Sequence, residues 1–295
     1  MNTLAPHETS IRLPASGRMR TAVVDRREWT CLHEMFDLIA VPVGDAPLMP
    51  LVQPTVRRLQ HGEMLFLEGA PTTSICIVRT GTFKVFRTAE DGYEQVYAFA
   101  RRGDLLGIDA LSGDHHLMAT VAQEDASVLA LSLSNFYALA QLLPAFDRGV
   151  MRAVTHSMID LIRLSDMMAA VAAEVRLARF LLHLAQRMST SEQAVRCLRL
   201  QMTRRDIGSY LGVAHETISR SFAALAEARL IEVEQRKVEI LDLDALRQYA
   251  QGARTRTKAD FPRCSVRAAR KGQAGAGRLI ERGGAQRLGP NARAD

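Results

Sequence analysis

Four polar side chains on one short predicted helix are of the types that read DNA bases. They are His215, Glu216, Ser219 and Arg220, on a helix predicted from His215 to Ala228. An arginine fork can bond O6 and N7 of guanine, and a glutamate can accept from N4 of cytosine. Glu216 and Arg220 lie on one helix face and can orient each other. A plain surface ion pair would use the same spacing, so the surrounding elements must decide between the two interpretations.

The elements around these residues form a helix-turn-helix pattern. A first short helix is predicted over Arg204 to Leu211, and Thr203 with Asp206 gives it a start close to a capping box. Gly212 can supply the left-handed residue that ends this helix, and Gly208 stands where another helix would approach closely. Two helices joined by a short glycine-containing turn are the helix-turn-helix unit, which favours DNA reading.

A predicted hairpin follows the second helix. Ile231 and Val233 alternate with polar residues, and Val238 and Ile240 do the same opposite them. A helix-turn-helix followed by a hairpin is a winged helix, whose second helix lies in the major groove with its N-terminal residues at base edges. The side chains expected to contact phosphates, which position the protein without reading sequence, are Thr203, Arg204 and Thr217.

The middle of the chain has the pattern of an all-β domain. Gly69, Gly81, Gly92 and Gly103 recur at intervals of 12, 11 and 11 residues. Short apolar runs lie between and after them, which predicts a barrel or jelly roll. The runs are Ser74–Val78, Thr82–Phe86, Gln95–Phe99 and Ser127–Leu131. The Asp-Gly pair at Gly92 predicts a hairpin turn.

The period then changes to that of a helix, predicted over residues 145–173. Apolar or small residues recur at alternating spacings of three and four, as in a coiled-coil seam. These seam residues are Met151, Val154, Met158, Leu161, Ser165 and Met168. The alternative is a helix that packs only on its own domain. Because no seam residue is charged, we expect a dimer that forms without a ligand.

Composition divides the chain into five segments. They are a mostly disordered extension over 1–48 with a short helix around Trp29 to Leu38, an all-β barrel or jelly-roll domain over 49–144, a dimerisation helix over 145–173, a DNA-binding domain over 174–250 and a basic disordered tail over 251–295. The chain carries a net charge of +6, but the tail holds 11 basic and 3 acidic residues and the remaining residues are slightly acidic. Sequence-specific DNA contacts must therefore come from a local patch, whereas the tail can add sequence-blind affinity.

The sequence also indicates several classes to which the protein is not expected to belong. The chain has no apolar run of the ~18 residues that span a bilayer and no signal-peptide core, so we expect a cytoplasmic protein without membrane contact. Its four cysteines, Cys31, Cys76, Cys197 and Cys264, form no close pair, which argues against a zinc knuckle or a disulfide framework. The sequence offers no nucleophile–base pair, phosphate loop or metal-ligand spacing, so we expect no enzyme.

From about Arg57 to Leu246 the chain resembles the Crp/Fnr family of bacterial transcription regulators, on its Fnr/FixK side. The segments that carry the resemblance are His61–Glu63 with Phe66, Ile77–Gly81, Gly103–Gly107, Met202–Gly212 and His215–Arg220. The resemblance implies an α+β protein with an N-terminal cyclic-nucleotide-binding-like β-roll, a jelly roll, then a long dimerisation helix and a C-terminal winged helix-turn-helix.

The resemblance also implies a function. A homodimer would bind palindromic promoter sites on double-stranded DNA, with TTGAT-type half-sites read by Glu216, Ser219 and Arg220. His215 stands where the cyclic-AMP receptor branch has a further arginine, which points to Fnr-type specificity. The implied role is that of an activator in oxygen- or redox-linked gene control, and the segments Ala89–Glu94 and Ser112–Met118 resemble those that touch RNA polymerase.

The sensor departs from the family's ligand-binding patterns, so no cofactor is predicted. Gly107 is followed by Ile108 where nucleotide binders have Gly-Glu, and Leu117-Met118 stands near the Arg-Ser position, so the phosphate of cyclic AMP lacks its arginine. Oxygen-sensing Fnr proteins hold an iron–sulfur cluster with a group of N-terminal cysteines and one cysteine in the roll. Here only Cys31 lies near the N-terminus, and Ala130 stands about where the roll cysteine would be, so a cluster lacks ligands. A haem- or thiol-dependent sensor, with His115-His116 as a candidate haem ligand, and a cyclic-nucleotide-responsive regulator stay as alternatives.

Overall fold

The computed structural model describes residues 11–12, 21–22, 26–42, 52, 54–188 and 196–252. The tail predicted over 251–295 lies outside the described residues apart from Gln251 and Gly252, and so does most of the extension predicted over 1–48. The described part of that extension comprises two short paired strands, β1 (Ile11–Arg12) and β2 (Thr21–Ala22), and the helix α1 (Arg26–Leu38). The helix expected around Trp29 is thus present.

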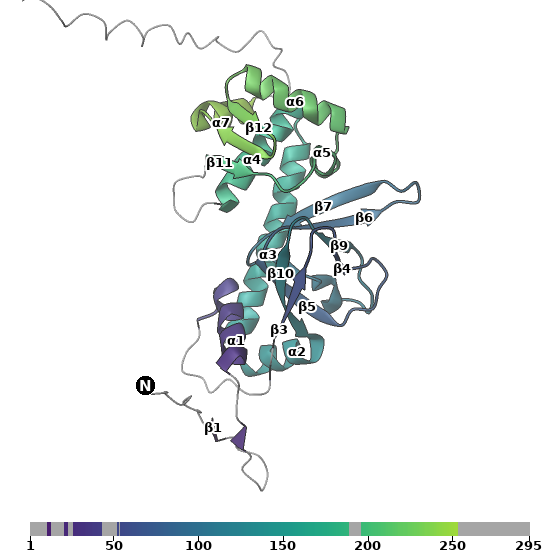
Figure 1. Cartoon of the computed structure of the whole chain (residues 1–295), viewed down its shortest axis with the longest axis vertical. Helices are drawn as coiled ribbons and strands as arrows, with labels where there is room; N and C mark the ends of the chain where they lie inside the picture. Colours follow the sequence, from purple (N-terminus) through teal and green to yellow (C-terminus); the bar gives the residue numbers. More distant parts are fainter. Residues whose placement is uncertain are drawn as a thin grey trace, which may run out of the picture. The chain divides into compact units, whose positions relative to one another are not determined.

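Two four-stranded antiparallel sheets make a jelly roll (Figure 1). One sheet has the order β3-β10-β5-β8 and the other the order β4-β9-β6-β7. The strands are β3 (Thr55–Leu59), β4 (Met64–Phe66), β5 (Ser74–Thr80), β6 (Phe83–Thr88), β7 (Glu94–Ala100), β8 (Leu105–Leu106), β9 (Ala119–Ala122) and β10 (Ala126–Ser132). The four predicted runs are β5, β6, β7 and β10, and the Asp-Gly turn joins β6 to β7. Their inward residues, such as Val78, Phe83 and Val128, are fully buried.

Helices close one end of the roll. The 3-10 turn η1 (Ile108–Leu111) follows β8, and α2 (Leu133–Leu142) follows β10. Met35 and Phe36 of α1 are buried in one apolar cluster with Leu129 of the roll and Phe146. The helix α1 of the extension therefore contributes to the core of the sensor.

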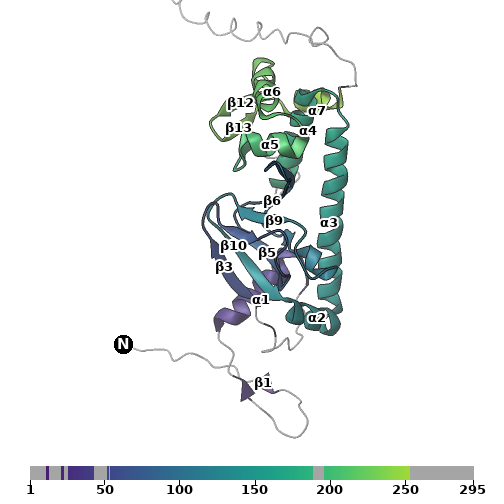
Figure 2. The same ribbon diagram turned by 90° about the vertical axis from the view of Figure 1, so that its right-hand side faces the viewer.

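The predicted dimerisation helix is α3 (Pro144–Met168), seen as one long helix beside the roll in Figure 2. It ends at Met168 and not at residue 173, because residues 169–172 form a turn before α4 (Ala173–Met188). On α3 the buried side chains are Phe146, Val150, Leu164 and Met167. The predicted inward face of α4 is also buried, with Leu177, Phe180, Leu181 and Leu184.

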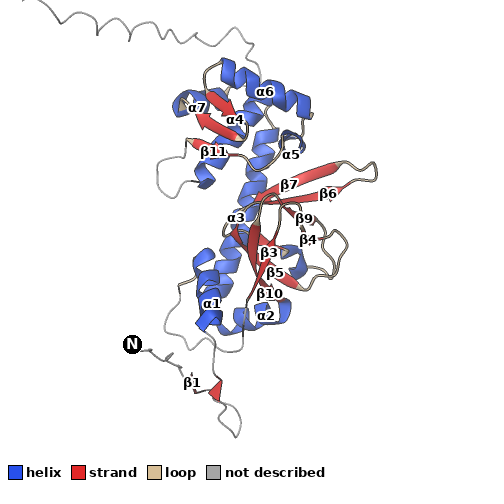
Figure 3. Ribbon diagram, in the orientation of Figure 1, coloured by secondary structure: helices blue, strands red, loops and turns tan. Residues whose placement is uncertain are grey.

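The C-terminal elements form a winged helix-turn-helix (Figure 3). They are β11 (Cys197–Arg199), α5 (Arg204–Leu211), α6 (His215–Glu227), β12 (Ile231–Glu234), β13 (Lys237–Ile240) and α7 (Leu243–Gln251). The predicted hairpin pairs Ile231 with Ile240 and Val233 with Val238. β11, which pairs with β13, and α7 are two elements that the sequence pattern did not predict. Within the described residues, no helix is long and apolar enough to cross a membrane.

Candidate nucleic-acid interface

The first helix of the helix-turn-helix has well-defined ends. The Thr203 hydroxyl accepts from the backbone N–H of Asp206, and the Asp206 carboxylate accepts from the backbone N–H of Thr203, so the predicted capping box is present. At the other end Gly212 is left-handed, with φ of 64°, a conformation that glycine adopts without a Cβ penalty. These two local signals fix α5 at the predicted residues.

Gly208 lets α5 and the start of α6 approach closely. A Cβ at this position would lie 2.7 Å from the backbone oxygen of Val213 and 3.4 Å from the backbone of His215. Gly208→Ala should therefore lower the free energy of unfolding by about 1–3 kcal/mol, because the turn must shift. Urea unfolding measures this change. Gly113→Ala is the control, since nothing lies within 4 Å of that Cβ, and an equal loss in both variants would contradict the prediction.

α6 divides its faces between the core and solvent. Ile218, Phe222 and Leu225 are buried, whereas all four predicted base-reading residues, His215, Glu216, Ser219 and Arg220, are exposed. Arg220 Nη2 lies 3.8 Å from Glu216 Oε2, and their side chains are 82% and 69% exposed. Such a pair adds little stability. Each of these two side chains can therefore leave the other and contact the edge of a DNA base instead.

The residues predicted to contact phosphates differ in how far their polar groups are already engaged within the protein. The guanidinium of Arg204 is stacked 3.3 Å above the Phe222 ring, and burial lowers its pKa. The hydroxyl and the backbone N–H of Thr203 both donate to Asp206, so a phosphate would have to displace that carboxylate. Thr217 is half-buried in the first turn of α6, whose N-cap residue Ala214 makes no side-chain hydrogen bond.

A buried ion pair joins this helix-turn-helix to the sensor, and sequence reasoning did not find it. Lys84 Nζ on β6 lies 3.0 Å from Asp206 Oδ1 and 2.7 Å from Glu94 Oε2, and the Lys84 and Asp206 side chains are about nine-tenths buried. Burial tends to raise the pKa of Asp206, but bonds from Thr203 and Lys84 outweigh it and leave the pKa lowered. The Asp206 carboxylate thus both caps α5 and forms the ion pair with Lys84 of the sensor.

Further bonds extend this contact along β7. The Ser209 hydroxyl donates to the Glu94 carbonyl at 2.6 Å and accepts from the Val96 N–H at 2.9 Å. The Gln95 amide donates to the Ser209 carbonyl. Tyr210 packs against Phe99 with ring centroids 5.2 Å apart. The helix α5 of the DNA-binding unit therefore packs on the β6–β7 edge of the roll and is hydrogen-bonded to it.

Replacing Lys84 with methionine should lower the free energy of unfolding by about 3 kcal/mol near neutral pH, because a buried carboxylate loses its cation. The lowered pKa of Asp206 gives stability that is present above its unfolded pKa of about 3.9 and lost as the pH falls through the folded value. Without Lys84 the folded pKa rises, so acid unfolding should begin at higher pH. Arg87→Met, which breaks the exposed Arg87–Glu68 pair, should cost less than about 1 kcal/mol. Equal losses, or an unchanged acid transition, would contradict this prediction in pH-dependent urea unfolding.

The predicted seam of α3 is open in the single chain. Met151, Met158, Leu161 and Met168 are 61%, 59%, 53% and 40% exposed. Ser165 is also exposed, and Val154 is half-buried. Ile162, beside this stripe, is 60% exposed. Contiguous exposed apolar side chains of this extent are typical of an interaction surface.

The sensor's nucleotide-type turn does not fit a cyclic nucleotide. η1 starts after Gly107, but the Asp109 carboxylate contacts His116 Nδ1 at 3.0 Å and accepts from the Leu117 N–H at 2.7 Å. His116 is buried and is stacked on Phe66. A phosphate at this turn would meet a carboxylate and no arginine of η1, which is unfavourable. The turn after Gly107 therefore does not suit the phosphate of a cyclic nucleotide.

The cysteine and histidine residues fit a metal cofactor no better. Cys31 is half-buried in α1, Cys76 is buried in β5 and Cys197 is exposed. Burial raises the pKa of the Cys76 thiol to about 11, which makes it a poor ligand and nucleophile. The described ranges contain no group of three or more histidine, cysteine or acidic residues suited to a metal ion. His115 and His116 also diverge, one being exposed and the other buried.

Comparisons with known proteins agree with this geometry. The model of the Crp-like helix-turn-helix domain matches residues 175–249, and that of the cyclic nucleotide-binding domain matches residues 56–142. The chain is 32% identical over 197 residues to the transcriptional activator protein FnrA of Stutzerimonas stutzeri, which covers 67% of this chain and 81% of FnrA. It is 32% identical over 200 residues to the anaerobic regulatory protein of Pasteurella multocida, covering 68% and 73%.

Among solved structures, FixK2 from Bradyrhizobium japonicum superposes with a TM-score of 0.61 at 25% identity, covering 68% of this chain and 98% of FixK2. The fold and the site thus define a DNA-binding transcription regulator with a β-roll sensor and a winged helix. The chain belongs to the Crp/Fnr family. The members of this family are transcription regulators, which confirms the expectation that the protein is not an enzyme.

Proposed function

We propose that the protein is a transcription activator that binds palindromic, TTGAT-type promoter sites as a homodimer. The observation that carries this proposal is the division of α6, whose buried side holds it to the domain while His215, Glu216, Ser219 and Arg220 project from the other. Residues at the N-terminal end of a recognition helix are those that reach base edges in the major groove. Arg204 and Thr217 contact flanking phosphates, and Thr203 does so once Asp206 gives way.

Dimerisation through α3 supplies a second recognition helix, that of the partner subunit. The exposed seam from Met151 to Met168 has the heptad spacing that two parallel helices bury against each other. A two-fold symmetric protein reads a palindrome, with half-site centres about 10–10.5 base pairs apart or at multiples of that distance. The dimer needs no ligand because no seam residue is charged.

Activation in oxygen- or redox-linked control is supported by the relatives. Their names include a transcriptional activator and an anaerobic regulatory protein. The β6–β7 turn at Ala89–Glu94 and the loop Ser112–Met118 contact RNA polymerase in the cytoplasm. Tyr93 and Leu117 are 43% and 63% exposed on these two segments, which suits a protein contact.

Selection from random DNA with the purified full chain tests the reading specificity. The expected result is two inverted TTGAT-type half-sites at the spacing given above. Enrichment of a single half-site would contradict dimeric binding, and no enrichment would contradict base reading. Genomic footprints taken with and without oxygen test the physiological link, which fails if occupancy is the same in both.

A further inference from the structure

The DNA-binding unit, α4 to α7, is joined to the seam helix α3 by one short turn. The turn comprises residues 169–172, where the helical conformation of α3 stops. Short segments at the ends of helices are where domains commonly rotate against each other. The contacts that the DNA-binding unit makes with the rest of its own subunit therefore decide in which direction the recognition helix α6 points.

The contacts of α5 with the sensor are mostly directional polar bonds. The Lys84–Asp206 ion pair is buried, and Ser209, which is 4% exposed, bonds through its hydroxyl to two backbone groups of β7. Just before α5, Gln201 Nε2 donates to Glu124 Oε2 of the sensor at 2.9 Å. Because each of these bonds has its own preferred geometry, together they hold α5 in one position and one rotation on the sensor.

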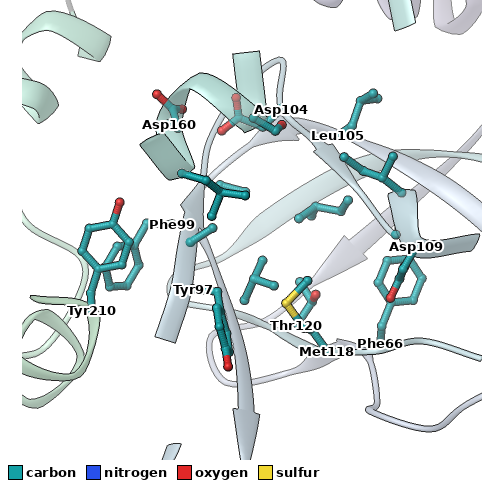
Figure 4. A pocket seen from close by; sticks show the side chains of 18 of the residues that line it. Phe66, Tyr97, Phe99, Asp104, Leu105, Asp109, Met118, Thr120, Asp160 and Tyr210 are labelled. Carbon is teal, nitrogen blue, oxygen red and sulfur yellow. The ribbon is translucent and has the colours of Figure 1, made fainter. Parts of the chain in front are cut away.

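A further contact holds the end of α4. Arg187 donates to Asp104 Oδ1 at 2.7 Å and lies 3.2 Å from Asp160 Oδ2. Asp104 belongs to the sensor and Asp160 to α3, and Figure 4 shows these two residues close together. In the same view Tyr210 of α5 lies beside Phe99 of β7. The DNA-binding unit is thus attached to the sensor through both α4 and α5.

The polar character of this contact indicates a role in geometry more than in stability. Two buried charges lose their hydration, so an ion pair such as Lys84–Asp206 adds less stability than its attraction suggests. The best-attested use of buried polar groups is to select one arrangement among several that apolar packing would allow. The arrangement selected here is the orientation of α5, and with it that of α6.

The contact leaves the proposed base-reading residues open. While the Lys84–Asp206 pair is formed, the Glu216 and Arg220 side chains are 69% and 82% exposed, and His215 and Ser219 are exposed as well. The sensor therefore holds the DNA-binding unit without covering the side of α6 that would enter the major groove. A contact of this kind can remain in place while DNA is bound.

We infer that Lys84 and Ser209 are positioning residues, through which the β6–β7 edge selects the spacing between half-sites that the dimer accepts. The inference rests on the proposed homodimer and its palindromic site, and it assigns the spacing preference to named residues. One added base pair moves two half-sites apart by about 3.4 Å and rotates one against the other by about 35°. Two rigidly held recognition helices cannot follow that change, whereas two loosely held ones can.

Two variants loosen the contact without leaving a buried charge unpaired. The double variant Lys84→Met/Asp206→Asn removes both members of the ion pair, and the new amide can still accept from the Thr203 N–H. Ser209→Ala removes the two bonds to β7. Arg87→Met is the matched control, because it breaks an exposed ion pair of the same strand β6 that lies wholly within the sensor.

Anisotropy titrations with labelled DNA measure the spacing preference. The probes are the operator at the spacing that the wild type selects, the same operator with one base pair added, and a single half-site. The wild type should bind about 100-fold more weakly when the base pair is added, because the second half-site contact is no longer intramolecular. Both loosened variants should lose less than about tenfold and bind the single half-site as the wild type does. A loss of stability alone would weaken binding to every probe equally and leave this ratio unchanged.

The distance between the two DNA-binding units can also be measured without DNA. Cys197 is exposed on β11, and a nitroxide attached to it reports this distance by pulsed electron resonance once Cys31 and Cys264 are replaced by serine. The wild-type dimer and Arg87→Met should give one narrow distance distribution. The two loosened variants should give a clearly broader one.

The inference is overturned if both loosened variants keep the wild-type spacing ratio or the wild-type distance distribution. It is also overturned if they bind the operator more tightly at its selected spacing, because the contact would then restrain DNA binding. A monomeric wild type, or one without a spacing preference, would contradict the proposed function and the inference together. A dimeric wild type whose strict spacing the variants share would contradict the inference alone.

Discussion

An Arg220→Ala variant should bind its operator about 30-fold more weakly or worse, while its affinity for unrelated DNA changes little. One bidentate arginine–guanine contact provides about 1–3 kcal/mol of discrimination, and a dimer loses two of them. Arg220 is 82% exposed and its contact with Glu216 is long, so the substitution removes no packing. Gel-shift titrations on operator and scrambled DNA measure both affinities.

Two further variants show whether Arg220 reads a base or only adds charge. Arg220→Lys keeps the charge but loses the planar fork, so it should lose specificity nearly as fully as alanine does. Arg247→Ala removes an exposed positive charge on α7 and should leave the preference for operator DNA intact. Equal weakening on operator and scrambled DNA in Arg220→Ala would refute base reading by this residue.

Placing glutamate at both Met151 and Met158 should convert the dimer to a folded monomer at micromolar concentration. Both side chains are about three-fifths exposed in the single chain, so the fold of one subunit does not depend on them. Burying four carboxylates along one seam costs several kcal/mol, which weakens dimerisation at least about 100-fold. Operator affinity should fall by a similar factor, because the second half-site contact is no longer intramolecular.

Light scattering measures the mass, and circular dichroism shows whether the subunit stays folded. Tyr137→Glu is the matched control, since it charges an apolar side chain of α2 that is 47% exposed and lies outside the seam. We expect this variant to remain a dimer. A dimeric Met151→Glu/Met158→Glu protein, or a monomeric wild type, would show that α3 does not join the subunits.

The parts of the fold that the sequence predicts are those with local causes. The ends of α5 follow from Thr203, Asp206 and Gly212, which act within a few residues of one another. The wing follows from alternation over two adjacent runs, and the turn at Gly92 from one dipeptide. Because each signal and its structure share a short segment, no tertiary information is needed.

The missed elements have non-local causes. β11 is three residues long and exists because it pairs with β13, about 40 residues later. β8 is a two-residue strand held by Cys76 and Ile77. The turn at residues 169–172 contains neither glycine nor proline, so the helical pattern continues across it. Short strands and helix breaks of this kind are set by packing and not by propensity.

The same division holds for the functional residues. The residues predicted to read bases stand out in the sequence because they follow a recognisable turn. Lys84 was not found because its partner Asp206 is 122 residues away, and a lysine within a strand is usually solvent-facing. The signal for His183 was equally weak, since a single histidine on an amphipathic helix is common in cores. Only the structure shows that its side chain lines a cavity and that its buried Nδ1 has no hydrogen-bond partner among the described residues.

The missing cap at Ala214 divides the recognition helix into two halves of different order. Its first turn lacks the side-chain bond that typically adds about 1 kcal/mol, whereas Ile218 and Phe222 clamp the second turn to the core. Local opening should therefore be frequent at His215 and Glu216 and rare at Ser219 and Arg220. If Arg220 reads a base as proposed, that base pair would meet a side chain whose backbone is already ordered. A base pair read by Glu216 would have to supply the ordering entropy of a whole turn, so substitutions in the operator should be tolerated better there.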